Sequence, residues 1–236
     1  MAEQRKDNIQ RAKLARQCER YDEMAKEMKQ VAEMSVELTE EERTLLSDAY
    51  RRAISTRRSA WRVIESHVKK STMDKQKQGV KELQKKVESE AEEKGREILT
   101  LLDNQLIPKA ADPEAKVFYM RMKGDFHRYL AEIKPSETKD LRNALKAYQE
   151  AYSIAQEKLR PSHPIRLGVA LNFSVFYEEL LKSTEEARRI AQKAHDDANA
   201  VILAESNNKT LKEALDLMIK LSNNLREWNK RKGGAE

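Results

Sequence analysis

The scarcity of proline and glycine is the feature that most constrains the fold of this chain. The first proline is Pro108, and the 236 residues contain only five prolines and six glycines. Because these residues mark the turns between strands, their scarcity argues against a barrel, a sandwich or a doubly wound sheet. The rest of the sequence is rich in Ala, Leu, Glu, Lys, Arg, Gln and Met, which favour helices. The sequence therefore predicts an all-α fold.

Prolines and polar clusters divide the chain into nine predicted helices. Thr39 followed by three glutamates is typical of a helix N-terminus, and Asp112 before Pro113 predicts another. Pro108 is expected to end the fourth helix, because the residue before a proline disfavours the α conformation. Short connections favour antiparallel neighbours. The predicted helices span residues 3–18, 20–34, 39–70, 74–106, 113–134, 137–159, 165–182, 184–203 and 209–228.

Membrane insertion and secretion are not predicted. No apolar run is long enough to span a bilayer, and the polar N-terminus lacks the apolar core of a secretory leader. Cys18 is the only cysteine, which excludes an intramolecular disulfide and fits a reducing compartment. We expect a cytoplasmic protein, with the nucleus as an additional location.

The net charge of +6 raises the possibility of a nucleic-acid partner. However, the 46 basic residues are interleaved with 40 acidic ones, and the basic clusters at 51–62 and 230–232 are short. Neither zinc-finger spacing nor a leucine-zipper heptad accompanies them. Nucleic-acid binding is therefore the minor alternative.

Signals of catalysis and of metal or cofactor binding are weak. The four histidines are not at ligand spacing from one another or from Cys18. The glycines of the helical region stand alone, so no phosphate loop is predicted, and Ser174 lacks a glycine elbow. No catalytic residue, cofactor or metal is predicted, and a binding protein is the better class.

Polar side chains at helical spacing are the more informative feature. Residues seven apart lie on one helix face, and an acid between two arginines can orient guanidinium groups toward an anion. Such pairs also arise by chance as solvated ion pairs in a chain this rich in charge. The pattern indicates an anion site without establishing one. Its members are Arg51 and Arg58, then Arg121, Asp125 and Arg128, and then Asn172 and Glu179.

Four longer segments carry a specific family pattern. They are residues 19–25, 42–62, 116–132 and 163–177, the last reading His-Pro-Ile-Arg-Leu-Gly-Val-Ala-Leu-Asn-Phe-Ser-Val-Phe-Tyr. The pattern resembles the 14-3-3 family of phosphoserine- and phosphothreonine-binding adaptors, in one register over essentially the whole chain. The resemblance implies non-catalytic binding of phosphorylated client proteins. It also implies a cup-shaped dimer of antiparallel helices, with one domain over 1–236, a dimerisation half at 1–110 and the rest of the peptide groove at 111–230.

The resemblance also assigns roles to single residues. A phosphorylated hydroxyl carries about −1.5 to −2 charge, which guanidinium groups and a phenol can satisfy. Amides both donate and accept, so asparagines can bind peptide backbone. The implied phosphate-binding residues are Arg51, where the family usually has lysine, Arg58, Arg128 and Tyr129. The other implied groove residues are Asn172 and Asn224 for the peptide backbone, Leu171, Val175 and Leu217 for the apolar wall, and Glu179. Arg62 is expected on a neighbouring face, with little effect on phosphate.

The dimer contact is implied in the same way. A homodimer is expected, and a heterodimer with a paralogue is the alternative. A small apolar patch is expected to supply most of its affinity, since rim ion pairs contribute little. The implied residues are Leu14 and Cys18 against Ala60 and Ile64 of a second copy, with Leu83 nearby, and the ion pairs Arg20–Glu90 and Glu23–Lys86.

Four residues depart from the family pattern. Positions that are usually apolar in the groove wall are here Asp48, Asp216, Lys220 and Glu227. Charges at these positions weaken or redirect the binding of peptides with apolar flanks. Two alternatives therefore stay open: a 14-3-3-like scaffold with altered or lost phosphopeptide specificity, and a basic helical scaffold that binds nucleic acid.

Overall fold

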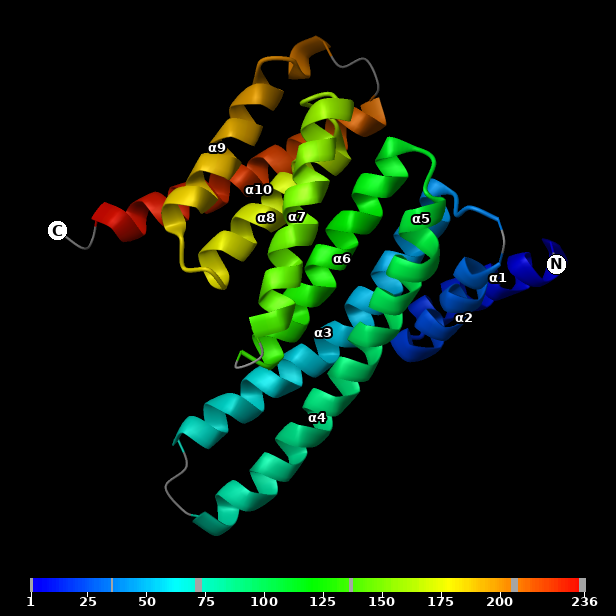
Figure 1. Cartoon of the computed structure of the whole chain (residues 1–236), viewed down its shortest axis with the longest axis vertical. Coiled ribbons are helices and arrows are strands. Elements are labelled where there is room, and N and C mark those ends of the chain that lie inside the picture. The colour runs from blue at the N-terminus through cyan, green and yellow to red at the C-terminus, as the bar shows by residue number, and fades with distance from the viewer. Residues whose placement is uncertain (1, 35, 71–73, 136–137, 205–207, 234–236) are drawn as a thin grey trace. The chain divides into compact units, whose positions relative to one another are not determined.

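The computed structural model describes residues 2–34, 36–70, 74–135, 138–204 and 208–233, and within these ranges it contains helices and no strand (Figure 1). The prediction of an all-α fold is confirmed. The helices are α1 (Ala2–Gln17), α2 (Tyr21–Glu33), α3 (Glu40–Lys70), α4 (Asp74–Leu101), α5 (Ile107–Lys109), α6 (Pro113–Ile133), α7 (Thr138–Lys158), α8 (Pro164–Glu179), α9 (Thr184–Asn199) and α10 (Asn208–Gly233).

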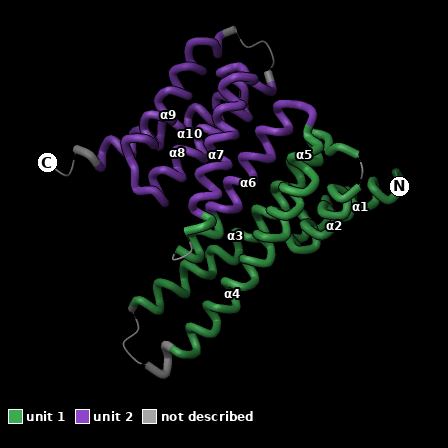
Figure 2. The backbone as a smooth tube through the Cα atoms, in the orientation of Figure 1, with its two compact units in different colours: residues 1–110, 129–140 green, residues 111–128, 141–236 purple. Residues whose placement is uncertain are grey.

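The chain forms two compact units (Figure 2). The first unit comprises residues 1–110 and 129–140, and the second comprises residues 111–128 and 141–236. The division crosses α6 between Arg128 and Tyr129, which are consecutive in the sequence. The single domain and the cup-shaped dimer implied by the family resemblance stay predictions.

The core of the first unit is built by α2, α3 and α4. In this unit α3 packs along α4, and α2 packs on α3. Full burial of an aliphatic or methionine side chain contributes about 1.5–3 kcal/mol, so these contacts hold the helices together. The largest fully buried apolar side chains of this contact are Met24, Met28, Leu46, Ile54 and Ile98.

The start of α3 confirms a helix N-terminus at Thr39. The Thr39 N–H donates to Glu42 Oε2 at 2.8 Å, and the Glu42 N–H donates to Thr39 Oγ1 at 3.3 Å. This reciprocal arrangement is a capping box. Burial opposes ionisation of Glu42, but hydrogen bonds from Arg5 of α1 and from Thr39 outweigh it and lower the pKa of the carboxyl. The cap therefore also attaches α1 to α3.

The break in helical structure predicted before Pro108 is absent, although α4 itself ends at Leu101. A π-helical turn, Leu102–Leu106, follows α4, and helical structure continues as α5 to Lys109. Pro108 lies at the start of α5, which follows the π-turn without a break, so the missing proline N–H falls where the hydrogen-bonding register changes. The π-turn changes the hydrogen-bonding register before the proline, so that no sharp break is required.

Other helix ends differ from the sequence prediction by a few residues. Glu19 has φ of 56° after α1, and Lys182 has φ of 54° after α8. A residue in this left-handed region ends a helix, which explains why α8 stops at Glu179. The helix predicted to reach Leu203 ends as α9 at Asn199. The start predicted at residue 137 lies outside the described residues.

The second unit has a core of alanines and aromatic rings. Here α8 packs against α9, and α10 packs against both. Small side chains at spacings of three and four residues allow neighbouring helices to approach closely. The buried residues of α9 are Ala187, Ile190, Ala191, Ala194 and Ala198, and they share one cluster with Tyr148, Phe173, Phe176 and Trp228.

Candidate functional site

Arg58 of α3 is held by two residues of α6 within the first unit. Its guanidinium carbon lies 4.1 Å from the centroid of the Tyr129 ring. Its Nε donates to Glu132 Oε2 at 3.0 Å, and its Nη2 contacts the same oxygen. The Arg58 side chain is only 13% exposed. The ring and the carboxylate therefore fix the plane of this cation before any ligand arrives.

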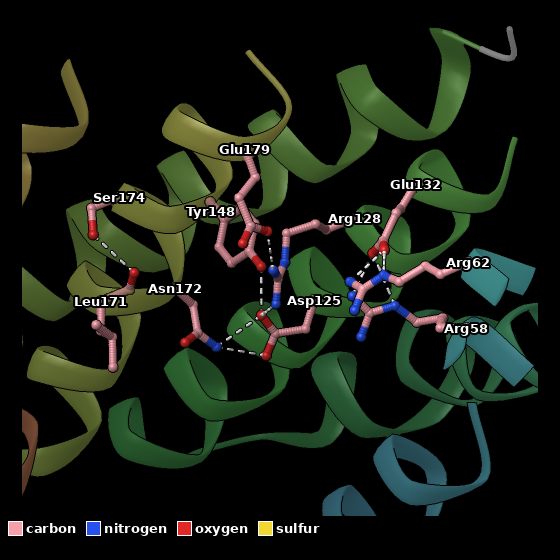
Figure 3. A network of polar contacts seen from close by, with 10 residues as sticks. All are labelled: Arg58, Arg62, Asp125, Arg128, Glu132, Tyr148, Leu171, Asn172, Ser174 and Glu179. Carbon is pink, nitrogen blue, oxygen red and sulfur yellow. Dashed lines mark hydrogen bonds and ion pairs between the residues drawn. The ribbon is translucent and has the colours of Figure 1, made fainter. Parts of the chain in front are cut away.

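Arg62 shares the carboxylate that holds Arg58. Its Nε donates to Glu132 Oε1 at 2.6 Å, so Glu132 binds both arginines (Figure 3). Arg62 and Arg58 are neighbours on the helix surface because they lie four residues apart. The expectation that Arg62 has little effect on phosphate stays a prediction. One carboxylate between two guanidinium groups leaves a net positive charge at this position.

Arg51 of α3 has a different environment. Its side chain is 55% exposed, and its Nη2 lies 2.6 Å from Asp48 Oδ1. The neighbouring Arg52 donates from Nε to both oxygens of Asp48, at 2.8 and 2.9 Å. These bonds and one to the Tyr21 hydroxyl raise the pKa of Arg52. Asp48, assigned from the family pattern to the groove wall, is thus the ion-pair partner of both arginines.

Arg128 lies in the second unit, where its side chain is mostly buried. Its Nη1 donates to Glu179 Oε2 at 3.4 Å, and its Nη2 lies 4.0 Å from Asp125 Oδ1. The side chain of Arg121 lies against Gly168 and the Phe118 ring instead. The expectation that Asp125 orients both arginines is therefore wrong for Arg121 and holds only at long range for Arg128.

Asp125 instead orients Asn172 of α8. The Asn172 Nδ2 donates to both Asp125 oxygens, at 2.9 and 3.0 Å (Figure 3). Because a carboxylate only accepts, the amide nitrogen of Asn172 must face Asp125, and its carbonyl oxygen must face away. That oxygen can accept a hydrogen bond from a peptide N–H. The two bonds to Asp125 thus fix the orientation of the Asn172 amide.

A glycine allows the third member of this network to approach. The Tyr148 hydroxyl donates to Asp125 Oδ1 at 2.5 Å. A Cβ on Gly124 would lie 2.8 Å from the Tyr148 ring, which is closer than real Cβ contacts allow. Gly124 therefore lets α7 bring Tyr148 to Asp125, a role that the sequence alone did not reveal.

Arg121 is a half-buried cation without a carboxylate partner among the described residues. Its guanidinium carbon lies 5.1 Å from the centroid of the Phe118 ring. A Cβ on Gly168 would lie 2.4 Å from Arg121 Nη1, so the glycine leaves the space that the guanidinium fills. Its buried Nε has no hydrogen-bond acceptor. The Phe118 ring and the space left by Gly168 therefore hold this guanidinium in place.

The other residues of the second unit that the family resemblance assigns to a groove are partly exposed. Leu171 and Val175 of α8 and Leu217 of α10 pack on the outside of one core cluster, and Asn224 is half-buried on α10. Of the four charged residues that depart from the family pattern, Asp216 and Lys220 are exposed. Glu227 is also exposed and accepts from Arg231, which contacts Glu178 of α8 as well. Leu171, Val175 and Leu217 thus keep part of their apolar side chains exposed.

The residues implied in dimerisation lie mostly at the surface of the first unit. Leu14 is 59% and Leu83 52% exposed, and Cys18, Ala60 and Lys86 are exposed as well. Ile64 is only 8% exposed and packs inside its own unit, whereas Val63 beside it is exposed. Three of the residues implied in ion pairs between copies have partners in their own chain. Arg20 contacts Glu23, and Glu90 Oε2 lies 3.5 Å from Arg57 Nε.

Ser174 makes an ordinary helix contact in the second unit. Ser174 is buried, and its hydroxyl donates to the Leu171 carbonyl at 2.9 Å, as a helix serine commonly does. No cluster of histidine, cysteine and acidic side chains in this part of the chain has the makings of a metal site. None of the described helices could span a membrane.

The chain is closely similar to known proteins along nearly its whole length. The family model for the 14-3-3 protein matches residues 11–229. The 14-3-3 protein zeta of Bombyx mori is 49% identical over 231 residues, which cover 97% of this chain and 93% of that protein. The 14-3-3 proteins beta/alpha-B of Xenopus laevis and beta/alpha of Homo sapiens are each 46% identical, over 97% of this chain and 94% of each relative. The chain therefore belongs to the 14-3-3 family of phosphopeptide-binding adaptors.

Proposed function

We propose that this adaptor holds the phosphate of its ligand with Arg51, Arg58, Arg128 and Tyr129 and catalyses no reaction. The observation that carries the proposal is Arg58, which is stacked on Tyr129 and oriented by Glu132. A phosphoserine brings about −1.5 to −2 charge and three acceptor oxygens, so several guanidinium groups can bind it at once. A serine hydroxyl offers neither, which explains selection for the phosphorylated form.

The peptide on either side of the phosphate is assigned to the second unit. Asn172 and Asn224 bind its backbone, and Glu179 contributes a polar contact. The orientation that Asp125 imposes on Asn172 supports this role. Arg121 adds a further cation, supported by its lack of a carboxylate partner among the described residues. The apolar wall comprises Leu171, Val175 and Leu217.

The chain acts as a dimer, and the first unit of each copy supplies the contact between the two copies. Helix α1 buries only Asn8 and Ala12 within its own chain, and Leu14 remains exposed beyond them. An apolar patch of this kind usually marks a protein contact. The proposed contact sets Leu14 and Cys18 of one copy against Ala60 and Val63 of the other, beside the mostly buried Ile64 and near Leu83. It is flanked by Arg20, Glu23, Lys86 and Glu90. The dimer is proposed to work in the cytoplasm, and in the nucleus as well.

Light scattering tests the dimer directly. The wild type is expected at twice the 27.4 kDa mass of the chain at micromolar concentration. Leu14→Asp is expected to lower the mass toward that of one chain, because a buried carboxylate without a partner is costly at an apolar contact. Val36→Asp, at another exposed apolar side chain of the first unit, is the matched control and should leave the mass unchanged. A wild type at 27.4 kDa would contradict the proposal.

Fluorescence polarisation tests the phosphate site. A phosphoserine peptide library is titrated beside its dephosphorylated twin, and only the phosphorylated members are expected to bind. Equal binding of both libraries would contradict the proposal. Retention on RNA or DNA with a steep salt dependence would favour the nucleic-acid alternative, because release of counterions from phosphates gives that dependence.

A second candidate is an adaptor with redirected peptide specificity. Its support is the exposure of Asp216 and Lys220 on α10, at positions where the family pattern is apolar. Charged side chains there disfavour apolar peptide flanks, because docking would remove water from them. Sequencing of the library members that bind separates the candidates: apolar flanks support the general adaptor, and charged flanks support the redirected one.

A further inference from the structure

The Asp48 carboxylate lies beneath two guanidinium groups on α3. Its side chain is 14% exposed, although it comes from the surface of the helix, while Arg51 and Arg52 around it are 55% and 44% exposed. Oδ1 accepts from both arginines, and Oδ2 accepts from Arg52. This anion is therefore covered by the cations that it binds.

The two arginines are not held equally. Arg52 donates from Nε to both oxygens of Asp48, and its Nη1 donates to the Tyr21 hydroxyl at 3.2 Å. Its guanidinium carbon also lies 5.3 Å from the centroid of the Tyr21 ring. Arg51 has one hydrogen bond to Asp48, and within the described residues it has no other polar partner. Arg51 is thus the member that can leave at little cost.

Departure of Arg51 leaves Asp48 satisfied. Arg52 alone supplies a bond to each carboxylate oxygen, so the anion does not become unpaired when Arg51 turns away. If Arg51 remained bound to Asp48, a ligand phosphate on the same guanidinium would lie close to the Asp48 carboxylate, and the two negative charges would repel each other. Arg51 therefore binds a ligand phosphate more favourably after it has left Asp48.

We propose that Asp48 competes with the ligand phosphate for Arg51 and thereby lowers the affinity of this adaptor for phosphopeptides. Asp48 thus determines how much Arg51 contributes to phosphopeptide affinity, because the ligand phosphate must displace the carboxylate from Arg51. The proposal rests on the phosphate site proposed above. It differs from a wall-lining role, in which the shape of residue 48 would matter and Arg51 would be unaffected.

A double-mutant cycle tests the competition. Wild type, Asp48→Asn, Arg51→Ala and the double variant are titrated against the strongest binder of the phosphoserine library, by fluorescence polarisation. Asparagine keeps the shape of the side chain and removes its charge. Asp48→Asn is expected to tighten binding about threefold, because Arg51 no longer has to leave an ion pair before it binds phosphate. Arg51→Ala is expected to weaken binding about twofold in the wild type and about sixfold in the Asp48→Asn background.

A matched control tests whether the same change of net charge elsewhere in the protein alters the affinity. Like Asp48, Glu186 of α9 is a helix acid that binds an arginine three residues later, Arg189, although its side chain is more exposed, at 43%. Glu186→Gln changes the net charge by the same amount as Asp48→Asn and is expected to change affinity less than twofold. Asp48→Val is included as a second variant, and thermal unfolding confirms that each variant is folded.

The outcomes separate this proposal from the phosphate site itself. If Arg58→Ala abolishes phosphopeptide binding while Asp48→Asn fails to tighten it, the competition is wrong and the site stands. The competition is also wrong if Arg51→Ala costs equally in both backgrounds, or if Glu186→Gln tightens binding as much as Asp48→Asn. If Arg58→Ala has no effect and the dephosphorylated twin binds equally, the phosphate site and the competition both fall.

Discussion

Arg58 and Arg51 lie two turns apart on one face of α3, yet their surroundings are opposite. Arg58 is buried against the Tyr129 ring and fixed by Glu132, whereas Arg51 is mostly exposed and has a single bond to Asp48. Ordering a long side chain costs up to about 2 kcal/mol in lost rotamer freedom. Folding has already met that cost for Arg58, while a ligand must meet it for Arg51. Equal spacing on a helix therefore does not mean equal contribution to binding.

The largest effect is expected from Arg58→Ala. Truncating one partner of a buried charge pair costs about 2–5 kcal/mol, so phosphopeptide affinity should fall at least about thirtyfold. The exposed Arg189→Ala is the control, because it removes the same charge from another helix and should change affinity less than twofold. Equal losses for both variants would indicate diffuse electrostatics instead of a built site.

A smaller gain is expected from restoring apolar residues on α10. Asp216→Leu with Lys220→Leu should tighten binding of a phosphopeptide with apolar flanks about tenfold, since each contacted side chain adds roughly 1–2 kcal/mol of burial before losses. The ratio of the Arg58→Ala and Arg51→Ala effects should not change. An unchanged affinity, measured by fluorescence polarisation, would mean that these side chains extend into solvent and do not meet the peptide.

The Asp125 network is expected to have an intermediate effect. Asp125→Asn removes the charge that orients the Asn172 amide, so affinity should fall about fivefold, close to the value of one hydrogen bond. Tyr148→Phe removes a different bond to the same carboxylate and leaves Asn172 oriented, so its effect should be smaller. Calorimetric titration compares the two variants. A larger loss for Tyr148→Phe would contradict the orienting role.

Arg51→Ala is expected to have the smallest effect in the wild type, about twofold. An exposed ion pair contributes roughly 0–1 kcal/mol, and here the pair also competes with the ligand. Titration of the same phosphopeptide measures it beside Arg58→Ala. A loss equal to that of Arg58→Ala would show that the two arginines act alike and that burial does not separate them.

Much of the fold was predictable from the sequence because local signals carry it. The scarcity of proline and glycine indicated helices, and the capping box at Thr39 marked the start of α3. The continuation of helical structure past Pro108 was not predicted. It depends on the π-turn after α4, which is a local change of hydrogen bonding without a sequence signal of its own. Boundaries at Glu19 and Lys182 depend on a left-handed conformation of ordinary residues, which composition does not indicate.

Helix spacing predicts which candidate residues share a face of a helix, and it does not predict their partners. The spacing of Arg51 and Arg58 placed them on one face of α3. The pairing of Arg58 with Glu132 joins α3 to α6, and helix spacing says nothing of contacts between helices far apart in the sequence. The Asp48–Arg51 pair was within reach, since an acid three residues before an arginine is a local signal. The family pattern assigned Asp48 to the groove wall instead.

The affinity of Arg58→Ala for a phosphoserine peptide, measured beside the wild type and the dephosphorylated twin, tests the central claim most directly. The wild type is expected to bind the phosphorylated peptide and to ignore the twin. Arg58→Ala is expected to bind the phosphorylated peptide at least about thirtyfold more weakly than the wild type does, while Arg51→Ala retains about half of the affinity. Wild-type binding that does not depend on the phosphate, or Arg58→Ala binding that equals the wild type, would contradict the account.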